Sequence, residues 1–355
     1  MVSSLVKRNM SRYSILALAL VLFSTIATTN TSTMLREQCP KPYIARDVNT
    51  CSLSGPRVIN HNCTNFHRIP GSYLNMIKGM NFNVHYAHTS HGGQLIQGLG
   101  LIGSENATFN YTTGYCDIFP SGDSLDILDG QRNNTQQIDY ITPDLYWEAS
   151  YGLDLTRYVL DHYPINVSMW AFCTQLDGCD ATWVQSYLGN ITALEAEYPD
   201  VVFVYMTGNA QATGAEGLNR HTNNEMIRQY CITNNKWLFD FGDIDCWYGS
   251  AENAYNYENQ RIPVEHAQYH DPDGPAHTND ASCLRKGGAT WWLLARIIGW
   301  TGVNDPGLGA SITTPGVSGY AEIWLFLGFA LGMVAITILV GKKARCLKSC
   351  NDGLP

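Results

Sequence analysis

Apolar strands alternate with helical segments between residues 152 and 299, and this rhythm constrains the fold more than any other feature of the chain. The strands are expected at 165–172, 201–206 and 236–241, and the helices at 152–163, 181–198, 218–233 and 287–299. The run VVFVYM at 201–206 has no charged residue, which is typical of a strand covered on both faces. A further strand is expected at 80–88. Together these segments predict an α/β domain with a parallel sheet.

The composition supports a folded domain and excludes two classes of protein. Hydrophobic residues make up 45% of the 355 residues and charged residues 15%, and the net charge is −9. A disordered chain would be poorer in apolar residues. A nucleic-acid-binding protein would carry a basic surface. We therefore expect no nucleic-acid partner.

The N-terminus has the features of a secretory signal peptide. The basic residues Lys7, Arg8 and Arg12 come before or at the start of a short apolar stretch at 15–26, and small residues allow a cut after Ala27. An uncleaved membrane anchor is the alternative. The stretch is shorter than the ~20 residues that a membrane-spanning helix needs, so we expect cleavage.

A longer apolar segment lies near the C-terminus. The run at 323–340 contains only apolar or small residues and is just long enough to cross a bilayer as a helix. Four basic residues follow it: Lys342, Lys343, Arg345 and Lys348. The positive-inside rule then predicts a single-pass protein of the cell membrane with a cytoplasmic tail and an extracytoplasmic domain. A lipid-anchor signal is the alternative, but such signals usually end in the hydrophobic stretch.

These features predict six segments along the chain. They are a signal peptide at 1–27, a Cys- and Pro-rich extension at 28–79, the main domain at 80–302, a Gly-, Ser-, Thr- and Pro-rich stalk at 303–322, a transmembrane helix at 323–341 and a basic tail at 342–355. Cys346 and Cys350 lie in the tail and are either acylated or plain reduced thiols.

Glycans and disulfide bonds are expected on the extracytoplasmic part. Asparagine stands in an N-x-S/T sequon at Asn30, Asn62, Asn106, Asn110, Asn133, Asn166 and Asn190. The cysteines that precede the transmembrane segment are Cys39, Cys51, Cys63, Cys116, Cys173, Cys179, Cys231, Cys246 and Cys283. Their number is odd, so at least one is free or pairs between chains. The first four are expected to form disulfides that hold the extension, and Cys173 is either bonded to Cys179 or free.

Polar residues follow the expected strands, at the edge where an open parallel sheet forms its sites. Ser90 follows the first strand and precedes Gly92 and Gly93, so its hydroxyl and its backbone N–H are expected to be exposed. Gln175 follows the next strand along the chain, and Asn209 follows the third. The candidate catalytic residues are therefore expected at the carboxyl ends of these strands.

The order of these blocks resembles the SGNH (GDSL-like) hydrolase superfamily over about residues 80–300. The resemblance is carried by HTSHGGQL, MWAFCTQ, VYMTG, the segment DPDGPAH that ends at His277, and GGATWWLLARIIGW. It implies a three-layer α/β/α sandwich with a flavodoxin-like parallel sheet. It also implies an enzyme that hydrolyses ester bonds without a cofactor or a metal, here as a divergent branch with an H-T-S-H-G nucleophile block.

The resemblance further implies roles for individual residues. The implied catalytic residues are Ser90, His277 and Asp273, and the implied oxyanion-hole residues are Gly152, Gln175 and Asn209. In this mechanism Ser90 attacks the acyl carbonyl while His277 takes its proton, and Asp273 orients the His277 ring. The expected substrate is an acyl or acetyl ester of a carbohydrate or of another small molecule.

The chain departs from the family pattern at three positions. Thr89 stands where the family has Asp before the nucleophile, and Gln175 is one methylene longer than the family's Asn. Gly274 occupies the acid position of the D-x-x-H motif, so Asp271 and Asp273 are the nearest carboxylates.

Other functions stay open at this point. A metal-dependent hydrolase would use clustered His and Asp residues, namely His85, His88, His91, His266, His270, Asp271 and His277. However, His85 and His88 would point to opposite faces of a strand. A catalytically inactive receptor or adhesin on the same fold is another alternative. A cysteine nucleophile at Cys173 is a further one, with no other support in the sequence.

Overall fold

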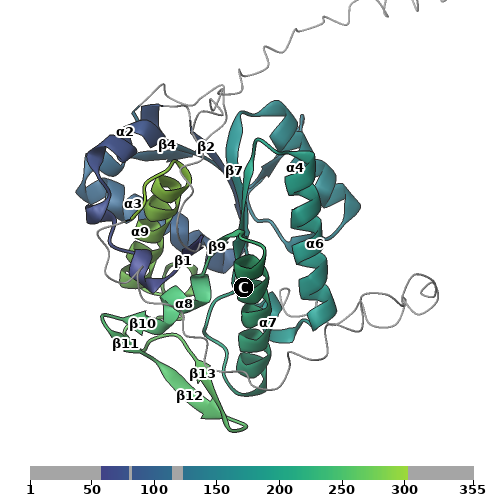
Figure 1. Cartoon of the computed structure of the whole chain (residues 1–355), viewed down its shortest axis with the longest axis vertical. Coiled ribbons are helices and arrows are strands. Elements are labelled where there is room, and N and C mark those ends of the chain that lie inside the picture. Colours follow the sequence, from purple (N-terminus) through teal and green to yellow (C-terminus); the bar gives the residue numbers. More distant parts are fainter. Residues whose placement is uncertain (1–56, 80–81, 114–122, 303–355) are drawn as a thin grey trace, which may run out of the picture. The chain divides into compact units, whose positions relative to one another are not determined.

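The computed structural model describes residues 57–79, 82–113 and 123–302 (Figure 1). The expected signal peptide, stalk, transmembrane helix and cytoplasmic tail lie outside these residues, as do Asn30, Cys39, Cys51 and Cys116. Within the described ranges, no helix has the length and apolar character needed to span a bilayer.

The core of the domain is a sheet of seven parallel strands in the order β1-β9-β8-β7-β2-β4-β3 (Figure 1). The strands are β1 Val58–Ile59, β2 Asn83–His88, β3 Tyr111–Thr113, β4 Leu125–Asp129, β7 Ile165–Ala171, β8 Val202–Met206 and β9 Trp237–Phe239. Every residue of β7 is buried, as expected for a central strand covered on both faces. The predicted parallel α/β architecture is confirmed.

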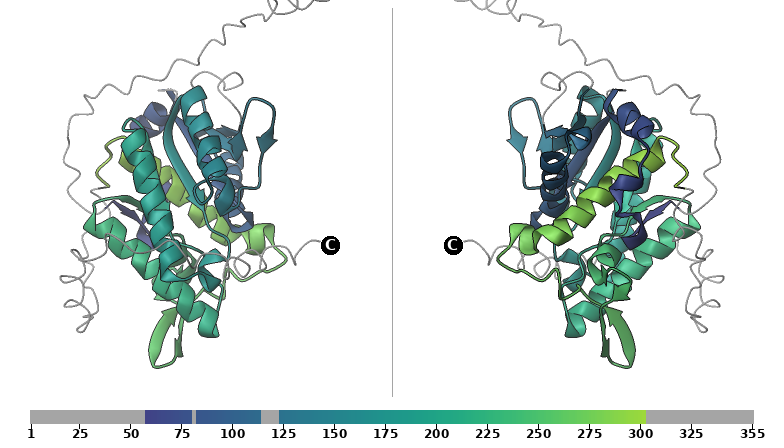
Figure 2. Two further views of the ribbon diagram at one scale, coloured as in Figure 1. Left: turned by 90° about the vertical axis from the view of Figure 1, so that its right-hand side faces the viewer. Right: turned by 90° about the vertical axis from the view of Figure 1, so that its left-hand side faces the viewer.

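Helices cover both faces of this sheet. One face carries α2 Gly71–Gly79, α3 Gly93–Glu105, α8 Phe241–Cys246 and α9 Asp280–Ile297, and the other carries α4 Ser150–His162, α6 Ala181–Glu197 and α7 Gly214–Thr233. The two views of Figure 2 look at these two helical layers in turn. Each layer buries its own apolar cluster against the sheet, so the domain has a core on either side.

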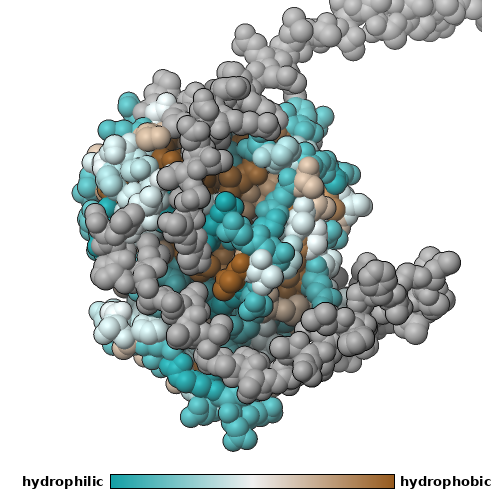
Figure 3. All heavy atoms as spheres, in the orientation of Figure 1, coloured by the Kyte–Doolittle hydropathy of each residue, from teal (hydrophilic) through white to brown (hydrophobic). Residues whose placement is uncertain are grey.

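Shorter elements complete the described part. They are β5 Gln131–Arg132, β6 Gln137–Ile138, α5 Gln175–Gly178, β10 Trp247–Tyr248, β11 Ala251–Glu252, β12 Ala254–Tyr257, β13 Gln260–Pro263 and the 3-10 turns η1 His61–Cys63, η2 Phe66–Arg68, η3 Ser90–Gly92, η4 Ala107–Phe109, η5 Pro143–Leu145 and η6 Pro275–His277. The β12–β13 hairpin projects from the helical layers, and its surface is hydrophilic (Figures 1 and 3).

Two parts of the sheet were not expected from the sequence. Val58 and Ile59 form edge strand β1 beside β9, within the segment that was expected to be an irregular extension. Strands β3 and β4 lie in a stretch that was expected to consist of loops and short elements. The part of the extension from Arg57 onward therefore shares the sheet and the core of the main domain.

The structure has no disulfide bond between Cys173 and Cys179, which was one of the two states expected for Cys173. Cys173 carries a free thiol, because its Sγ points toward Ser90 and His91 instead. Among the other cysteines that the structure describes, Cys231, Cys246 and Cys283 are also free thiols.

The sequon asparagines of the described part differ in exposure. Asn106 and Asn110 are exposed, whereas Asn166 is only 4% exposed in central strand β7. The side-chain oxygen of Asn166 accepts a hydrogen bond from the backbone N–H of Asn83 at 2.8 Å. A glycan is attached to the side-chain nitrogen, and a side chain this buried leaves no room for one, so the sequon at Asn166 is not accessible in the folded domain.

Helices α3 and α9 approach each other closely at two glycines. A Cβ on Gly287 would lie 2.4 Å from the backbone carbon of Gly98, and one on Gly98 would lie 1.9 Å from the carbonyl oxygen of Cys283. We expect Gly287→Ala to force the helices apart and to lower the free energy of unfolding by about 1–3 kcal/mol. Urea unfolding of the purified chain measures this.

The matched control is Gly189→Ala in α6, where a Cβ meets open space. This change is expected to stabilise the chain by up to about 1 kcal/mol through helix propensity. Equal unfolding midpoints for the two variants would contradict the close helix contact.

Candidate active site

The candidate site lies where two neighbouring parallel strands end. Strand β2 ends at His88 and leads into Ser90 and His91, while β7 ends at Ala171 and leads into Cys173. His88 and Ala171 are paired in the sheet, so both chain segments leave it at the same level. This brings residues 90, 91 and 173 together at the carboxyl edge of the sheet.

Cys173 is the centre of this group. Its Sγ lies 3.1 Å from the Oγ of Ser90 and 3.1 Å from the Nδ1 of His91. Cys173 and His91 are 8% and 4% exposed, whereas Ser90 is half-buried. A thiol and an imidazole at this distance can exchange a proton.

Gln211 fixes which ring nitrogen of His91 carries a proton. The Nε2 of Gln211 donates to Glu265 Oε1 at 3.0 Å and to the backbone carbonyl of His277 at 2.6 Å. Because both of these groups only accept, the amide must turn its Oε1 toward His91 Nε2, which lies 2.8 Å away. His91 therefore donates from Nε2 and presents Nδ1 to the sulfur of Cys173.

The electrostatics of the pair favour ionisation. Burial alone would raise the pKa of Cys173, but the hydrogen bonds and charge of His91 and the hydrogen bond from Ser90 lower it from 9.0 to about 6. Burial alone would lower the pKa of His91, yet its contacts with Cys173 and Gln211 raise it above 6.5. A thiolate–imidazolium pair is thus favoured near neutral pH.

The two amide side chains expected in the oxyanion hole hold the backbone of Cys173. The Oε1 of Gln175 accepts from the Cys173 N–H at 2.6 Å, and the Nδ2 of Asn209 donates to the Cys173 carbonyl at 2.6 Å. Gly152 is buried within α4, where a Cβ would lie 2.0 Å from the carbonyl oxygen of Asp144. In this structure Gln175 and Asn209 position the thiol, and Gly152 allows close packing.

His277 reaches the site mainly through its backbone. Its ring packs against His91 with centroids 4.8 Å apart, and it forms a hydrogen bond with the carbonyl of Pro272. His277 and the expected acid Asp273 are both exposed. The structure thus brings His277 beside the Ser90 segment, but it is His91 that forms the short contact to the cysteine.

The backbone around His277 is strained. Ala276 and His277 have φ values of 51° and 68°, in the left-handed region that non-glycine residues rarely adopt. The carbonyl of Ala276 accepts from Gln94 at 2.8 Å, and that of His277 accepts from Gln211. Strain of this kind persists where the surrounding structure holds it and often accompanies function.

The histidines considered for a metal site are dispersed. His85 is enclosed between Ser168 and the carbonyl of Gly130, and burial lowers its pKa to about 4. His88 lies on the opposite face of β2, with its Nε2 2.9 Å from Asp129. Within the ranges that the structure describes, no group of three His, Cys, Asp or Glu residues could hold a metal ion.

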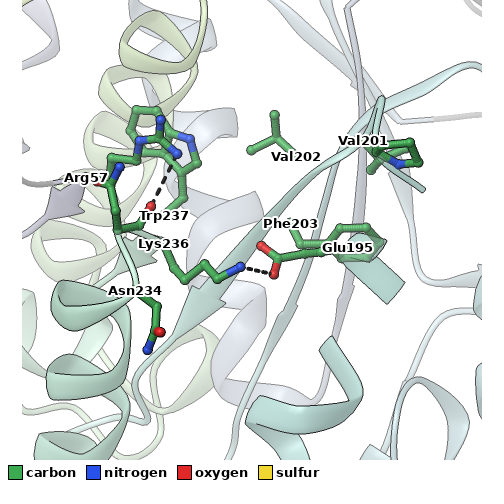
Figure 4. A pocket seen from close by; sticks show the side chains of 10 residues that line it. Arg57, Glu195, Val201, Val202, Phe203, Asn234, Lys236 and Trp237 are labelled. Atoms are coloured by element: carbon green, nitrogen blue, oxygen red, sulfur yellow. Dashed lines mark hydrogen bonds and ion pairs between the residues drawn. The ribbon is translucent and has the colours of Figure 1, made fainter. Parts of the chain in front are cut away.

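A cavity of about 400 Å³ lies at the other end of the strands, where they begin (Figure 4). It sits at the amino ends of β8 and β9, where Arg57 stacks over Trp237 and Lys236 pairs with Glu195 at 2.5 Å. Because Cys173 is at the carboxyl edge, this cavity is separate from the candidate site.

The sequence alone indicated His91 only as a ligand of the alternative metal site, and it gave no role to Gln211 or Glu265. His91 stands directly after Ser90, and Gln211 stands two residues after Asn209, so both were adjacent to predicted site residues. Glu265 has no such signal, because nothing in its sequence neighbourhood marks it as part of a strand end.

Comparisons with known proteins add little to this geometry. No family model and no curated protein matches the sequence. One similar solved structure is a Bacteroides fragilis protein proposed to be an acylhydrolase, at 12% identity and a TM-score of 0.34, with 66% of this chain and 98% of that chain covered. Another is the periplasmic domain of a lipopolysaccharide acetyltransferase from Salmonella ser. Paratyphi A, at 10% identity and a TM-score of 0.28, with 63% and 86% covered. These TM-scores are too low to support an argument about function, so that argument rests on the geometry of the site.

Proposed function

We propose that this chain is an acyl-transfer hydrolase in which the thiolate of Cys173 is the nucleophile and His91 is the acid–base group. The observation that carries the proposal is the 3.1 Å contact between Cys173 Sγ and His91 Nδ1, with Nε2 held by Gln211. A cysteine and a histidine oriented by an amide side chain are a known arrangement for acyl transfer on unrelated folds.

The proposed reaction has two steps. The thiolate attacks the carbonyl carbon of an ester, and the alkoxide leaves with the proton from His91 Nδ1, which gives an alcohol and a thioester on Cys173. Water then attacks the thioester while His91 Nδ1 takes a proton from it. The thiolate leaves, a carboxylic acid is released, and the ion pair of Cys173 and His91 is restored.

The substrate and the location remain those expected from the sequence. We propose an acyl or acetyl ester of a carbohydrate or another small molecule as the substrate. The chain would be anchored in the cell membrane by residues 323–341, with the site on the extracytoplasmic side. An inactive receptor on the same fold would not hydrolyse an ester, so the comparison of ester turnover between the wild-type chain and Cys173→Ala tests that alternative.

The pH dependence of Cys173 alkylation tests this proposal. Because the pKa is lowered to about 6, the thiolate is expected to be largely present at pH 7, and the rate with iodoacetamide should level off there. An ordinary thiol would still gain rate up to pH 9. Mass spectrometry of the Cys173 peptide separates this residue from the other cysteines, and His91→Ala is expected to restore an ordinary profile.

A serine nucleophile is the second candidate. It is favoured by the position of Ser90 at the end of β2, with its Oγ 3.1 Å from Cys173 Sγ. This version uses His277 as the base and Asp273 as its partner. A fluorophosphonate probe that labels the wild-type chain but not Ser90→Ala or His277→Ala would support it against the thiol mechanism.

A further inference from the structure

We propose that Glu265 is a positioning residue that acts through Gln211 to keep the base of the site in its working form. This inference rests on the proposed function, because it concerns the same Cys173–His91 pair. Glu265 does not touch the thiol. Together with the carbonyl of His277 it determines which way the amide of Gln211 faces, and the amide determines which nitrogen of His91 is free to take a proton.

Glu265 is built into the domain as a buried acceptor. It is 6% exposed and follows strand β13. Its Oε1 accepts from Gln211 Nε2 at 3.0 Å and from Thr278 Oγ1 at 3.2 Å, and its Oε2 lies 3.3 Å from His270 Nδ1. Contacts on both oxygens therefore hold the carboxylate in one orientation.

The backbone beside Gln211 is clamped from two sides. The N–H of Ala210 donates to Asp245 Oδ2 at 2.9 Å, and its carbonyl accepts from the N–H of Glu265 at 2.8 Å. Gln211 therefore has little freedom to follow a movement of its neighbours. The rotation of its amide is the remaining degree of freedom, and the carboxylate of Glu265 restricts it.

If the side-chain amide of Gln211 were reversed, His91 could no longer act as the base. If Gln211 turned its Nε2 toward His91, the Nε2 of His91 would have to accept, and the proton of the neutral ring would move to Nδ1. Nδ1 would then face Cys173 as a donor and could not take the thiol proton. The carboxylate of Glu265 prevents this, because it cannot donate to an amide oxygen.

Several charged groups surround this chain of contacts. Lys286 and Asp245 form a buried ion pair at 2.5 Å, and Arg220 faces Asp177 and Asp245. His270 faces Glu265, while Asp177, Asp245 and His277 face the Cys173–His91 pair. Burial and the charge of Asp245 raise the pKa of Glu265, whereas Gln211, His270 and Lys286 lower it. The charge of Asp245 favours the imidazolium form of His91 directly, and Glu265 acts on His91 through the orientation of Gln211.

The test is the pH profile of Cys173 alkylation by iodoacetamide in the full chain, compared between wild type and Glu265→Gln. We expect the midpoint to rise by about one pH unit, which is roughly a fivefold lower rate at pH 6 and close to a tenfold lower rate at pH 5. The maximal rate at pH 9 should stay the same. Glu197→Gln, which removes an exposed partner of Arg157, is the matched control and should leave the profile unchanged.

The outcomes separate this inference from the function on which it rests. A wild-type midpoint near 9 would overturn the thiolate mechanism itself. A wild-type midpoint near 6 that Glu265→Gln does not move would leave the mechanism standing and overturn the role of Glu265. A purely structural role would lower the unfolding midpoint and leave the pH profile in place.

A second variant covers the case in which Glu265→Gln fails to fold. Gln211→Met keeps the side-chain size but removes its three side-chain hydrogen bonds, to His91, Glu265 and the His277 carbonyl, so the midpoint should rise by a similar amount. If Glu265 acts through Gln211, the double variant should shift no further than Gln211→Met alone. Additive shifts would show that Glu265 acts by another route.

Discussion

Cys173→Ala is expected to abolish turnover of an activated acyl ester such as 4-nitrophenyl acetate, with a loss of at least about a thousandfold. Removing the sulfur removes the atom that would carry the acyl group. A rapid-quench sample of the wild-type chain should contain an acetyl group on the Cys173 peptide, and mass spectrometry detects it.

Ser90→Ala is the matched comparison for this experiment. Ser90 contributes one hydrogen bond to the sulfur, so its loss should reduce the rate by no more than about tenfold. Cys173→Ser should be nearly as inactive as Cys173→Ala, because a hydroxyl is not ionised by His91 at neutral pH. The reverse pattern, in which Ser90→Ala is inactive and Cys173→Ala active, would overturn the thiol mechanism in favour of the serine one.

Lys286→Met is expected to cause the largest loss of stability, about 3–5 kcal/mol. Lys286 is 0% exposed in α9, and its Nζ lies 2.5 Å from Asp245 Oδ1 and 2.6 Å from Ser282 Oγ. Methionine would leave Asp245, itself only 1% exposed, as an unpaired buried charge. Urea unfolding of the purified chain gives the change in free energy.

A double variant separates the buried charge from lost packing. Lys286→Met combined with Asp245→Asn should be more stable than Lys286→Met alone, because asparagine is neutral and still accepts from the N–H of Ala210. Arg157→Met breaks an exposed ion pair with Glu197 and should cost no more than about 1 kcal/mol. A similar loss for Lys286→Met and Arg157→Met would rule out the desolvated pair as the cause.

The regular part of the fold was predictable because its elements bury continuous apolar surface. The stretches expected at 165–172 and 201–206 correspond to β7 Ile165–Ala171 and β8 Val202–Met206. The helix expected at 181–198 is α6 Ala181–Glu197, which begins at its Asp180 cap. In each case the apolar period and the flanking residues agree with the tertiary environment.

Strands β1, β3 and β4 were missed for two different physical reasons. Strand β1 has only two residues, Val58 and Ile59, and β3 has only three, Tyr111–Thr113, which is too short for any period to appear. Strand β4 contains Asp126, a buried carboxylate that accepts hydrogen bonds from Thr112 and Ser124. A charged residue inside a strand obscures the apolar pattern, and its partners are visible only in the folded state.

The site was only partly predictable for a related reason. The rule that sites form at the carboxyl ends of parallel strands led to the Ser90 segment and to the turn that contains Cys173. It could not show that His91 faces the thiol, because the conformation of a 3-10 turn decides which side chain points inward. Nor could it identify Glu265, whose contact with Gln211 joins residues 54 positions apart.

The two groups that orient Gln211 come from a later part of the chain than Cys173, and this matters while the protein is being synthesised. Glu265 and His277 supply these groups, and both are synthesised long after Cys173. The chain leaves the ribosome with its N-terminus first, and a domain generally folds as a unit. Until the C-terminal part of the domain has joined the sheet, nothing holds His91 in the form that ionises the sulfur. The cysteine therefore emerges as an ordinary, slow thiol, and its reactivity reports that the domain is complete.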